Sequence, residues 1–155
     1  MRDLVYTAFM SLDGVVDSPG GGPGEEHRSG GWVFKDVEFL PEAFALKGEE
    51  LADTTALLFG RRSYEVFAPV WRESEDHAAY QDLPKYVVSS TLEDPGWHNS
   101  TVLRGDVVGE VSGLRTKTDG DIFVYASGPL VRTLMEHELV DKLRLMTHPV
   151  VLGAG

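Results

Sequence analysis

Short, continuously apolar runs that alternate with segments of helical periodicity restrict the fold of this chain more than any other feature. Apolar, β-prone runs predict strands at 4–10, 56–59, 86–88, 102–103, 122–126 and 143–152. Segments with apolar residues at helical spacing fall at 40–53, 63–67, 107–114 and 129–140. Strands that alternate with helices usually form a parallel sheet covered on both faces. The sequence therefore predicts an α/β fold with a mostly parallel central sheet.

Length and charge narrow the class of protein further. The 155 residues suit a single domain spanning 1–155, and the formal net charge of -11 makes the surface strongly acidic. Such a surface repels nucleic acid phosphates and anionic membranes, so neither is an expected partner. The chain has no cysteine, which excludes disulfides and thiolate metal sites. The first apolar run is too short for a signal peptide or a membrane span, so we expect a cytoplasmic protein.

A glycine-rich segment follows the first predicted strand. Residues 13–31 contain seven glycines together with Pro19 and Pro23, a composition that predicts a loop. A loop of this length inside a compact domain is usually functional or mobile, and a disordered surface excursion is the alternative. The sequence alone does not distinguish the two.

The turn after predicted strand 56–59 is suited to an anion. Ligands of parallel sheets bind outside the carboxyl ends of the strands, and Gly60-Arg61-Arg62-Ser63 stands at such an end. Free amides at a helix start and two guanidinium groups favour phosphate, and Ser63 can cap the helix or bond a phosphate oxygen. The alternative is that both arginines are solvated or pair with surface carboxylates.

Two further polar turns end predicted strands. Ala126-Ser127-Gly128-Pro129 follows strand 122–126 with an uncovered backbone and a proline suited to a first helical turn, although an ordinary tight turn would read the same way. Ser89-Ser90-Thr91 ends strand 86–88 and either bonds a ribose or phosphate or simply stops the strand. The motifs G-x-G-x-x-G, P-loop, H-E-x-x-H and G-x-S-x-G are absent, and the histidines lack metal-ligand spacing, so no metal site is predicted.

Five pieces in this order carry a resemblance to a known family. They are Ser11-Leu12-Asp13-Gly14, the segments 60–65, 85–89 and 127–130, and the closing segment 148–155. Together they resemble the dihydrofolate reductase-like fold, and most closely the C-terminal reductase domain of the bacterial bifunctional deaminase-reductase of riboflavin biosynthesis and its stand-alone relatives. The resemblance implies a three-layer fold, a reductase activity, NADPH as cofactor and a homodimer.

The resemblance also implies roles for individual residues. The basic turn would hold the adenosine-side phosphates and favour NADPH, the serine-rich turn would lie near the adenosine ribose, and the turn after 122–126 would cover the pyrophosphate. Ala8 and Gly14 would lie near the nicotinamide, under a loop that closes through Gly30, Gly31 and Trp32. The expected cofactor-binding residues are therefore Ala8, Gly14, Gly60, Arg61, Arg62, Ser63, Ser89, Ser90, Thr91, Ala126, Ser127, Gly128, Pro129 and Leu130.

Hydride transfer requires alignment and exclusion of water rather than a protein nucleophile. Asp13 and Asp36 are the candidate proton donors, with solvated surface carboxylates as the alternative for both. Phe9, Trp32 and Phe34 are candidate contacts of a flat substrate, and Trp32 and Phe34 are equally explained as core residues.

These observations predict an NADPH-dependent reductase that transfers hydride to a small nitrogen heterocycle, such as a riboflavin-pathway aminopyrimidine or a pterin. The alternative is a non-catalytic nucleotide- or flavin-binding protein that uses the same site. Relatives usually continue beyond the Gly-Ala-Gly turn at 153–155, so either the sequence is shortened or the family's C-terminal strands are absent. The strand at 143–152 would then lie at a sheet edge, which a partner subunit could cover.

Overall fold

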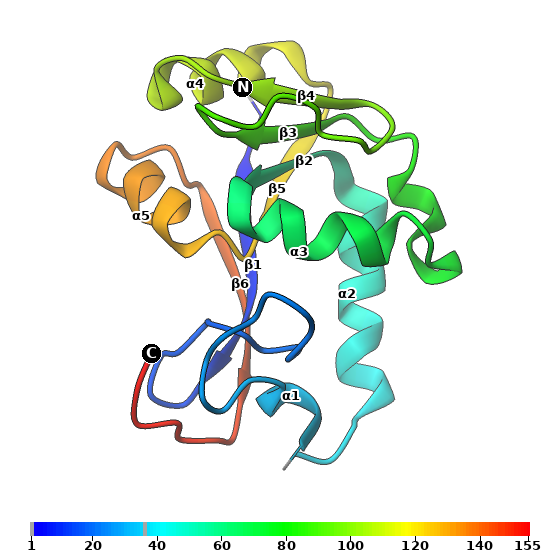
Figure 1. Cartoon of the computed structure of the whole chain (residues 1–155), viewed down its shortest axis with the longest axis vertical. Helices are drawn as coiled ribbons and strands as arrows, with labels where there is room; N and C mark the ends of the chain where they lie inside the picture. Colours follow the sequence, from blue (N-terminus) through cyan, green and yellow to red (C-terminus); the bar gives the residue numbers. More distant parts are fainter. Residues whose placement is uncertain (1, 36) are drawn as a thin grey trace.

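In the part of the chain that the structure describes, six parallel strands form one sheet in the order β4-β3-β2-β5-β1-β6. The computed structural model describes residues 2–35 and 37–155, and Figure 1 shows its arrangement. The strands are β1 (Leu4–Ser11), β2 (Thr54–Gly60), β3 (Lys85–Val88), β4 (Ser100–Leu103), β5 (Asp121–Tyr125) and β6 (Lys142–His148). The helices are α1 (Trp32–Lys35), α2 (Pro41–Asp53), α3 (Arg61–Trp71), the 3-10 helix η1 (Glu75–Tyr80), α4 (Val107–Lys117) and α5 (Gly128–Glu136).

Helices cover both faces of the central strands, which explains why β1, β2 and β5 are mostly apolar and buried, whereas the edge strand β6 keeps exposed residues. Successive strand residues point to opposite faces. Leu4 and Tyr6 of β1 therefore join the core under α4 and α5, whereas Val5 between them joins the core under α3 and η1. The three-layer α/β fold with a parallel central sheet is confirmed. No helix within the described ranges is long and apolar enough to cross a membrane.

Two predicted boundaries are wrong for identifiable reasons. The strand expected at 143–152 ends at His148, where the Val150 amide turns back to the His148 carbonyl at 2.8 Å, although apolar residues continue to Leu152. The helix expected at 129–140 ends at Glu136, because Glu138 takes a left-handed conformation with φ 55°. The Leu139 amide then bonds the Leu134 carbonyl at 2.9 Å, closing the last turn.

Helix α2 packs differently from what its apolar residues suggest. The predicted helix 40–53 is confirmed, but Leu40 and Leu46 are 52% and 55% exposed. The side that contacts β1 carries Phe44, an apolar residue of the predicted helix, together with Lys47 and Glu50, and Glu50 is buried. A buried charge is therefore part of the packing between α2 and the sheet.

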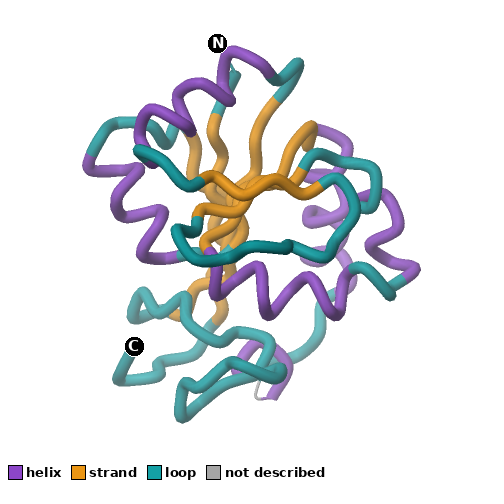
Figure 2. The backbone as a smooth tube through the Cα atoms, turned by 45° about the horizontal axis from the view of Figure 1, so that its top comes forward, coloured by secondary structure: helices purple, strands orange, loops and turns teal. Residues whose placement is uncertain are grey.

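The glycine-rich segment after β1 is a folded loop rather than a disordered excursion. Its turns are closed by main-chain bonds, such as the Gly31 amide to the Ser18 carbonyl at 2.9 Å. Gly21 has φ +69°, and a Cβ on it would lie 2.6 Å from the Gly31 nitrogen, so only glycine fits there. The loop lies beside the C-terminal segment beyond one end of the strands, where Figure 2 shows the two in teal.

Candidate functional site

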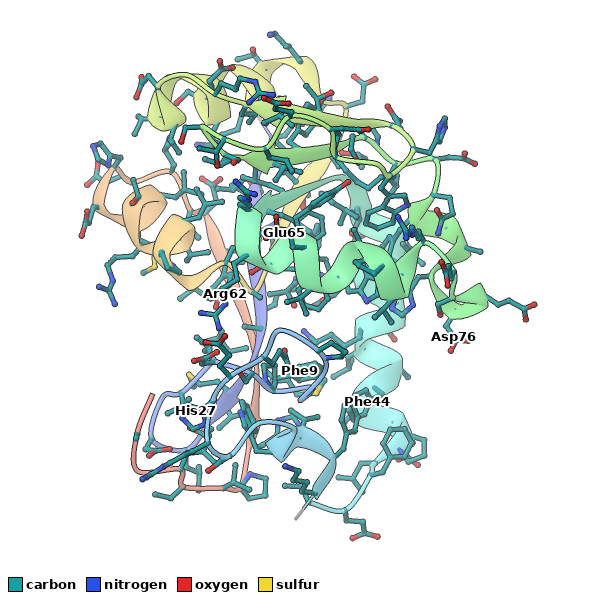
Figure 3. All side chains as sticks on the ribbon, in the orientation of Figure 1. Phe9, His27, Phe44, Arg62, Glu65 and Asp76 are labelled. Carbon is teal, nitrogen blue, oxygen red and sulfur yellow. The ribbon has the colours of Figure 1, made fainter. Side chains whose placement is uncertain are left out.

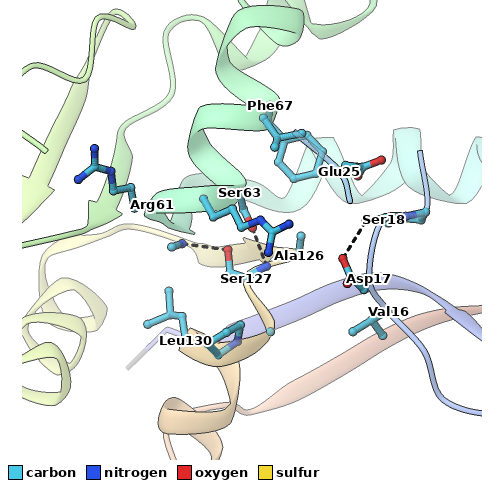
Figure 4. Close-up of a pocket in the computed structure, with 16 residues that line it drawn as sticks. Val16, Asp17, Ser18, Glu25, Arg61, Ser63, Phe67, Ala126, Ser127 and Leu130 are labelled. Carbon is cyan, nitrogen blue, oxygen red and sulfur yellow. Dashed lines mark hydrogen bonds between the residues drawn. The ribbon is translucent and has the colours of Figure 1, made fainter. Parts of the chain in front are cut away.

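The strand order places a switch point between β2 and β5. The chain leaves β2 through α3 toward β3 on one side, and leaves β5 through α5 toward β6 on the other. The starts of α3 and α5 consequently meet at the carboxyl edge of the sheet, where ligands of parallel α/β proteins bind. A cavity of about 360 Å³ lies there (Figure 4). Its lining includes residues 60–63, residues 126–130 and part of the glycine-rich loop.

Serine side chains connect the two helix starts. The Ser127 hydroxyl accepts from the Gly60 amide at 2.9 Å and donates to the Tyr125 carbonyl at 2.8 Å. The Ser63 hydroxyl accepts from the Ser127 amide at 2.9 Å. The prediction that Ser63 caps its own helix is therefore wrong. Ala126 and Ser127 have φ 48° and 59°, a left-handed conformation that L-residues adopt at a cost. The serine bonds hold this turn in place.

The first amides of α3 and α5 are the main-chain donors nearest the cavity, apart from Pro129, which has no N–H. The first amides of a helix have no partner within the helix and form the positive end of its dipole. A Cβ on Gly128 would meet no atom within 4 Å, so the space beside the first residue of α5 is open. Two helix starts that converge on one cavity are well suited to a phosphate group.

The two arginines point in different directions. The Arg61 Nε donates to Glu65 Oε1 at 2.9 Å, and its guanidinium also contacts the Thr91 hydroxyl beyond the end of β3. Arg62 lies on the loop side, 3.7 Å from Glu26. Both arginines thus pair with surface carboxylates, which was the alternative to phosphate binding. Exposed pairs of this kind contribute little stability, so an anionic ligand can replace them.

The serine-rich turn after β3 does not line the cavity. Ser89 is buried, and its hydroxyl accepts from the amides of Thr91 and Leu92 at 3.2 and 3.0 Å, which ends the strand. Ser90 is exposed. Only Thr91 is connected to the basic turn, through Arg61.

The Asp13 side chain is fully engaged in hydrogen bonds that hold together the turn after β1 and the C-terminal segment. Its carboxylate accepts from the Ser11 hydroxyl at 2.6 Å and from the amides of Leu152 and Gly153 at 3.1 and 2.8 Å. These bonds, the Ser11 bond foremost, lower the pKa of Asp13 to about 2. The carboxyl is therefore ionised at neutral pH and is a poor proton donor. Gly14 beside it has φ +82°, and Asp36, the other candidate donor, lies outside the described residues.

The candidate aromatic residues take different positions. Trp32 is buried, and its indole donates to the Asp17 carbonyl at 2.9 Å and packs edge-on against His148. It is therefore a core residue, which was the alternative interpretation. Phe34 is 60% exposed and stacks on Phe44 with ring centres 6.2 Å apart. Phe9 lies against both Phe44 and His148, at 5.7 and 5.5 Å. Ala8, next to it on β1, is buried.

Several residues of the site were missed by sequence reasoning. The loop contributes two carboxylates to the cavity wall, Asp17 and Glu25, and α3 contributes Val66 and Phe67. Helical spacing after Ser63 could have identified Val66 and Phe67, because residues three and four apart share a helix face. The position of the carboxylates depends on the folded loop, which carries no periodic signal.

The fold and the site define a class of protein: a parallel α/β domain with an anion pocket between two helix starts at the switch point. The RibD C-terminal domain model matches residues 2–155, and the chain belongs to that family. This is a reductase-type domain, which supports an oxidoreductase with a nicotinamide cofactor and confirms the family resemblance.

One curated protein and two solved structures are similar to this chain. The uncharacterized protein YyaP of Bacillus subtilis (strain 168) is 26% identical over 161 residues, covering 99% of this chain and 78% of YyaP. A crystal structure of a Shewanella sp. PV-4 protein assigned to riboflavin biosynthesis has a TM-score of 0.74 at 17% identity, covering 100% of this chain and 81% of that one. Acinetobacter baumannii RibD has a TM-score of 0.58 at 12% identity, and this chain covers 48% of its length. At these identities the two structures establish the fold alone.

Proposed function

We propose that this protein is an NADPH-dependent reductase that transfers hydride to a small nitrogen heterocycle, with an aminopyrimidine of riboflavin biosynthesis as the first substrate to test. One observation carries the proposal: the starts of α3 and α5 converge on one cavity at the switch point of a reductase-type domain. A cofactor with a pyrophosphate and a further phosphate requires this kind of arrangement.

The residues present fit such a cofactor. The open start of α5 at Gly128 would receive the pyrophosphate, and Arg61 with Thr91 would receive the 2′-phosphate that distinguishes NADPH from NADH. The carboxylates of Asp17 and Glu25 suit ribose hydroxyls, because they accept hydrogen bonds and repel phosphate. When bound, the reduced nicotinamide supplies the hydride.

The end of β1 would lie beside the reactive ring. Thr7 pairs with Tyr125, the residue directly before Ala126 of the cavity wall, so Ala8 is next to the cavity in the sheet. The loop that follows Gly14 forms the opposite wall through Val16–Pro19. Ala8 and the loop would thus align the ring and exclude water, which are the protein's main tasks in hydride transfer.

The test is ligand binding followed by turnover. Thermal midpoints would be measured without ligand, with NADPH and with NADH, and NADPH at about 100 times its Kd should raise the midpoint by about 5–10 °C. Oxidation of NADPH would then be followed with 5-amino-6-(5-phosphoribosylamino)uracil and with a dihydropterin. No midpoint shift with either nucleotide refutes the proposal, and binding without oxidation favours a non-catalytic binder. A yellow preparation that keeps its chromophore through desalting favours a flavin protein.

A variant tests the phosphate assignment. Arg61→Ala should weaken NADPH about 10-fold or more and leave NADH unchanged, since a hydrogen bond to a charged group contributes about 1.5–3 kcal/mol. Arg132→Ala is the matched control, because Arg132 is exposed on α5 and does not line the cavity. Equal loss of both nucleotides would show that Arg61 does not read the 2′-phosphate.

We also propose a homodimer formed through the edge strand β6. Leu143 and Leu145 on this strand are 51% and 37% exposed, and Val151 after it is 71% exposed. An edge strand with exposed apolar side chains is normally covered. Light scattering coupled to gel filtration measures the mass directly.

A further inference from the structure

A charged cluster lies where α2 packs on β1. We call it the α2–β1 cluster, and it consists of Thr7, Lys47 and Glu50. The Thr7 hydroxyl lies 2.9 and 3.1 Å from the two carboxylate oxygens of Glu50, to which it donates. The Lys47 ammonium lies 3.4 Å from Glu50 Oε2 and also donates to the Thr7 hydroxyl. The side chains of Lys47 and Glu50 are 19% and 7% exposed.

Stability does not explain this cluster. Taking a lysine and a glutamate out of water costs free energy that their attraction repays only in part, and apolar residues of similar size often pack at least as stably. The inner side of a helix that packs on a sheet is normally an apolar stripe. A buried ion pair one strand away from a ligand cavity is a candidate functional group.

One N–H group of the Lys47 ammonium makes no hydrogen bond to the described residues. An ammonium carries three N–H donors, and among the described residues two of them are used, by Thr7 and by Glu50. The Lys47 side chain retains 19% exposure, so it is not sealed off from solvent as Glu50 is. Glu50 and Thr7, both buried, hold the ammonium in place from beneath.

The cluster lies one strand away from the cavity wall and beside the aromatic side chains of Phe9 and Phe44, although none of its three residues lines the cavity. Thr7 pairs in the sheet with Tyr125, which directly precedes Ala126 of the cavity wall. The Lys47 nitrogen lies 5.3 Å from the centre of the Phe9 ring, and Phe9 packs against Phe44 of α2. In the view of Figure 3, Phe9 lies between Arg62 of the cavity wall and Phe44. A planar ring on these aromatic side chains would place a polar atom within reach of Lys47.

Other titratable groups surround the ammonium. Burial is the main cause that lowers the pKa of Lys47, the charge of Arg144 on β6 lowers it further, and Glu50 opposes both. Arg144 is itself paired with Asp53 at 3.5 Å. Tyr125 on β5 and Tyr80 on η1 share a 2.8 Å hydrogen bond, and burial raises the pKa of both, so they stay neutral.

We propose that Lys47, held by Glu50 and Thr7, binds the nitrogen or oxygen of the substrate that gains negative charge when hydride is added, and protonates it. The inference rests on the reductase function proposed above. The reduced nicotinamide is oxidised as its hydride forms a C–H bond at the substrate carbon, and the π pair of the C=N or C=O bond moves to the heteroatom. That atom takes a proton from Lys47 Nζ, and the resulting amine regains a proton from water. The substrate class is therefore a flat heterocycle with a reducible C=N or C=O bond.

The test compares Lys47→Met, Lys47→Arg and the control Lys117→Met, a lysine of α4 on the opposite face of the sheet. NADPH affinity is measured by the shift of the thermal midpoint. The values of kcat and KM, and the pH dependence of kcat, are measured with 5-amino-6-(5-phosphoribosylamino)uracil as substrate. Lys47→Met should keep NADPH affinity within about 2-fold and lose about 10²–10⁴-fold in kcat, the usual contribution of a positioned acid. Wild-type kcat should fall at alkaline pH, and this limb should vanish in Lys47→Met. Lys47→Arg should restore KM but not kcat, because arginine does not release its proton at these pH values.

A binding measurement covers the case of low turnover. The ε-CH₂ NMR signal of Lys47 should shift when the uracil is added in the presence of oxidised NADP, and Glu50→Gln should lower the pKa read from that signal. An unchanged signal together with unchanged kcat and pH profile in Lys47→Met overturns the inference while leaving the reductase function intact. Parallel loss of NADPH affinity and thermal midpoint in Lys47→Met also overturns it, in favour of a structural role. Failure of the wild type to bind NADPH or NADH overturns the reductase function itself.

Discussion

Ser127 provides the sharpest test of how the two helix starts are held together. Ser127→Ala removes an acceptor from the Gly60 amide and a donor to the Tyr125 carbonyl, at a side chain that is buried. An orphaned buried group costs about 1–3 kcal/mol, so the free energy of unfolding should fall by about 2 kcal/mol. Ser127→Gly loses the same two bonds, but glycine relieves the left-handed conformation at φ 59°. That relief is worth about 1 kcal/mol, so the glycine variant should be the more stable of the two.

The assay is urea unfolding followed by the fluorescence of the buried tryptophans Trp32, Trp71 and Trp97. For a domain of this size, a loss of about 2 kcal/mol corresponds to a thermal midpoint lowered by about 4–8 °C. The control is Ser90→Ala, which removes an exposed hydroxyl and should change stability by less than about 0.5 kcal/mol. If Ser127→Ala is as stable as the control, the serine bonds do not hold this turn. If Ser127→Gly is the less stable variant, the left-handed conformation at position 127 carries no strain that glycine relieves.

Three further predictions concern other parts of the molecule. Burial lowers the pKa of Lys85 from 10.5 to about 8, so between these pH values the unfolded chain binds more protons than the folded one. The free energy of unfolding of the wild type should therefore rise with pH relative to that of Lys85→Met. Urea unfolding at several pH values measures both, and a wild-type advantage that falls with pH would contradict the prediction. Asp13→Asn should accelerate amide hydrogen exchange at Leu152 and Gly153, and the stability that Asp13 contributes should be present above its unfolded pKa of 3.8 and lost as pH falls toward about 2. Leu145→Asp should halve the mass of a dimer formed through β6, whereas an unchanged mass would place the interface elsewhere.

The layered architecture was accessible from the sequence because parallel strands covered on both faces must be apolar throughout. The same property concealed the end of β6, since apolarity continues from Val150 to Leu152 after the hydrogen-bonded ladder has stopped. Where a run of apolar residues leaves a sheet is decided by contacts made elsewhere. Here these are the hydrogen bonds that the Leu152 and Gly153 amides donate to the Asp13 carboxylate.

The candidate site was predictable in its main chain and less so in its side chains. Glycine and small residues after strands indicated both helix starts, and strand order brought them together. The Arg61–Glu65 pair has the local i,i+4 spacing of a helix, but the contacts of Arg61 with Thr91 and of Arg62 with Glu26 depend on distant segments that no local pattern encodes. Lys47 and Glu50 were missed because a search for apolar periodicity assigns charged residues of a helix to the solvent side.

The pairing of β2 with β5 also joins two parts of the chain that are far apart in sequence, and we call this junction the seam. On one side lie β2, β3 and β4, which come from the continuous central segment 54–103, and on the other lie strands from the two terminal segments. The main-chain ladder across this seam is interrupted by a register shift between Thr54 and Ala56. A molecule that touches the starts of both α3 and α5 would clamp the central segment to the terminal ones. Binding should therefore slow the opening of the whole sheet, including strands that the ligand never touches.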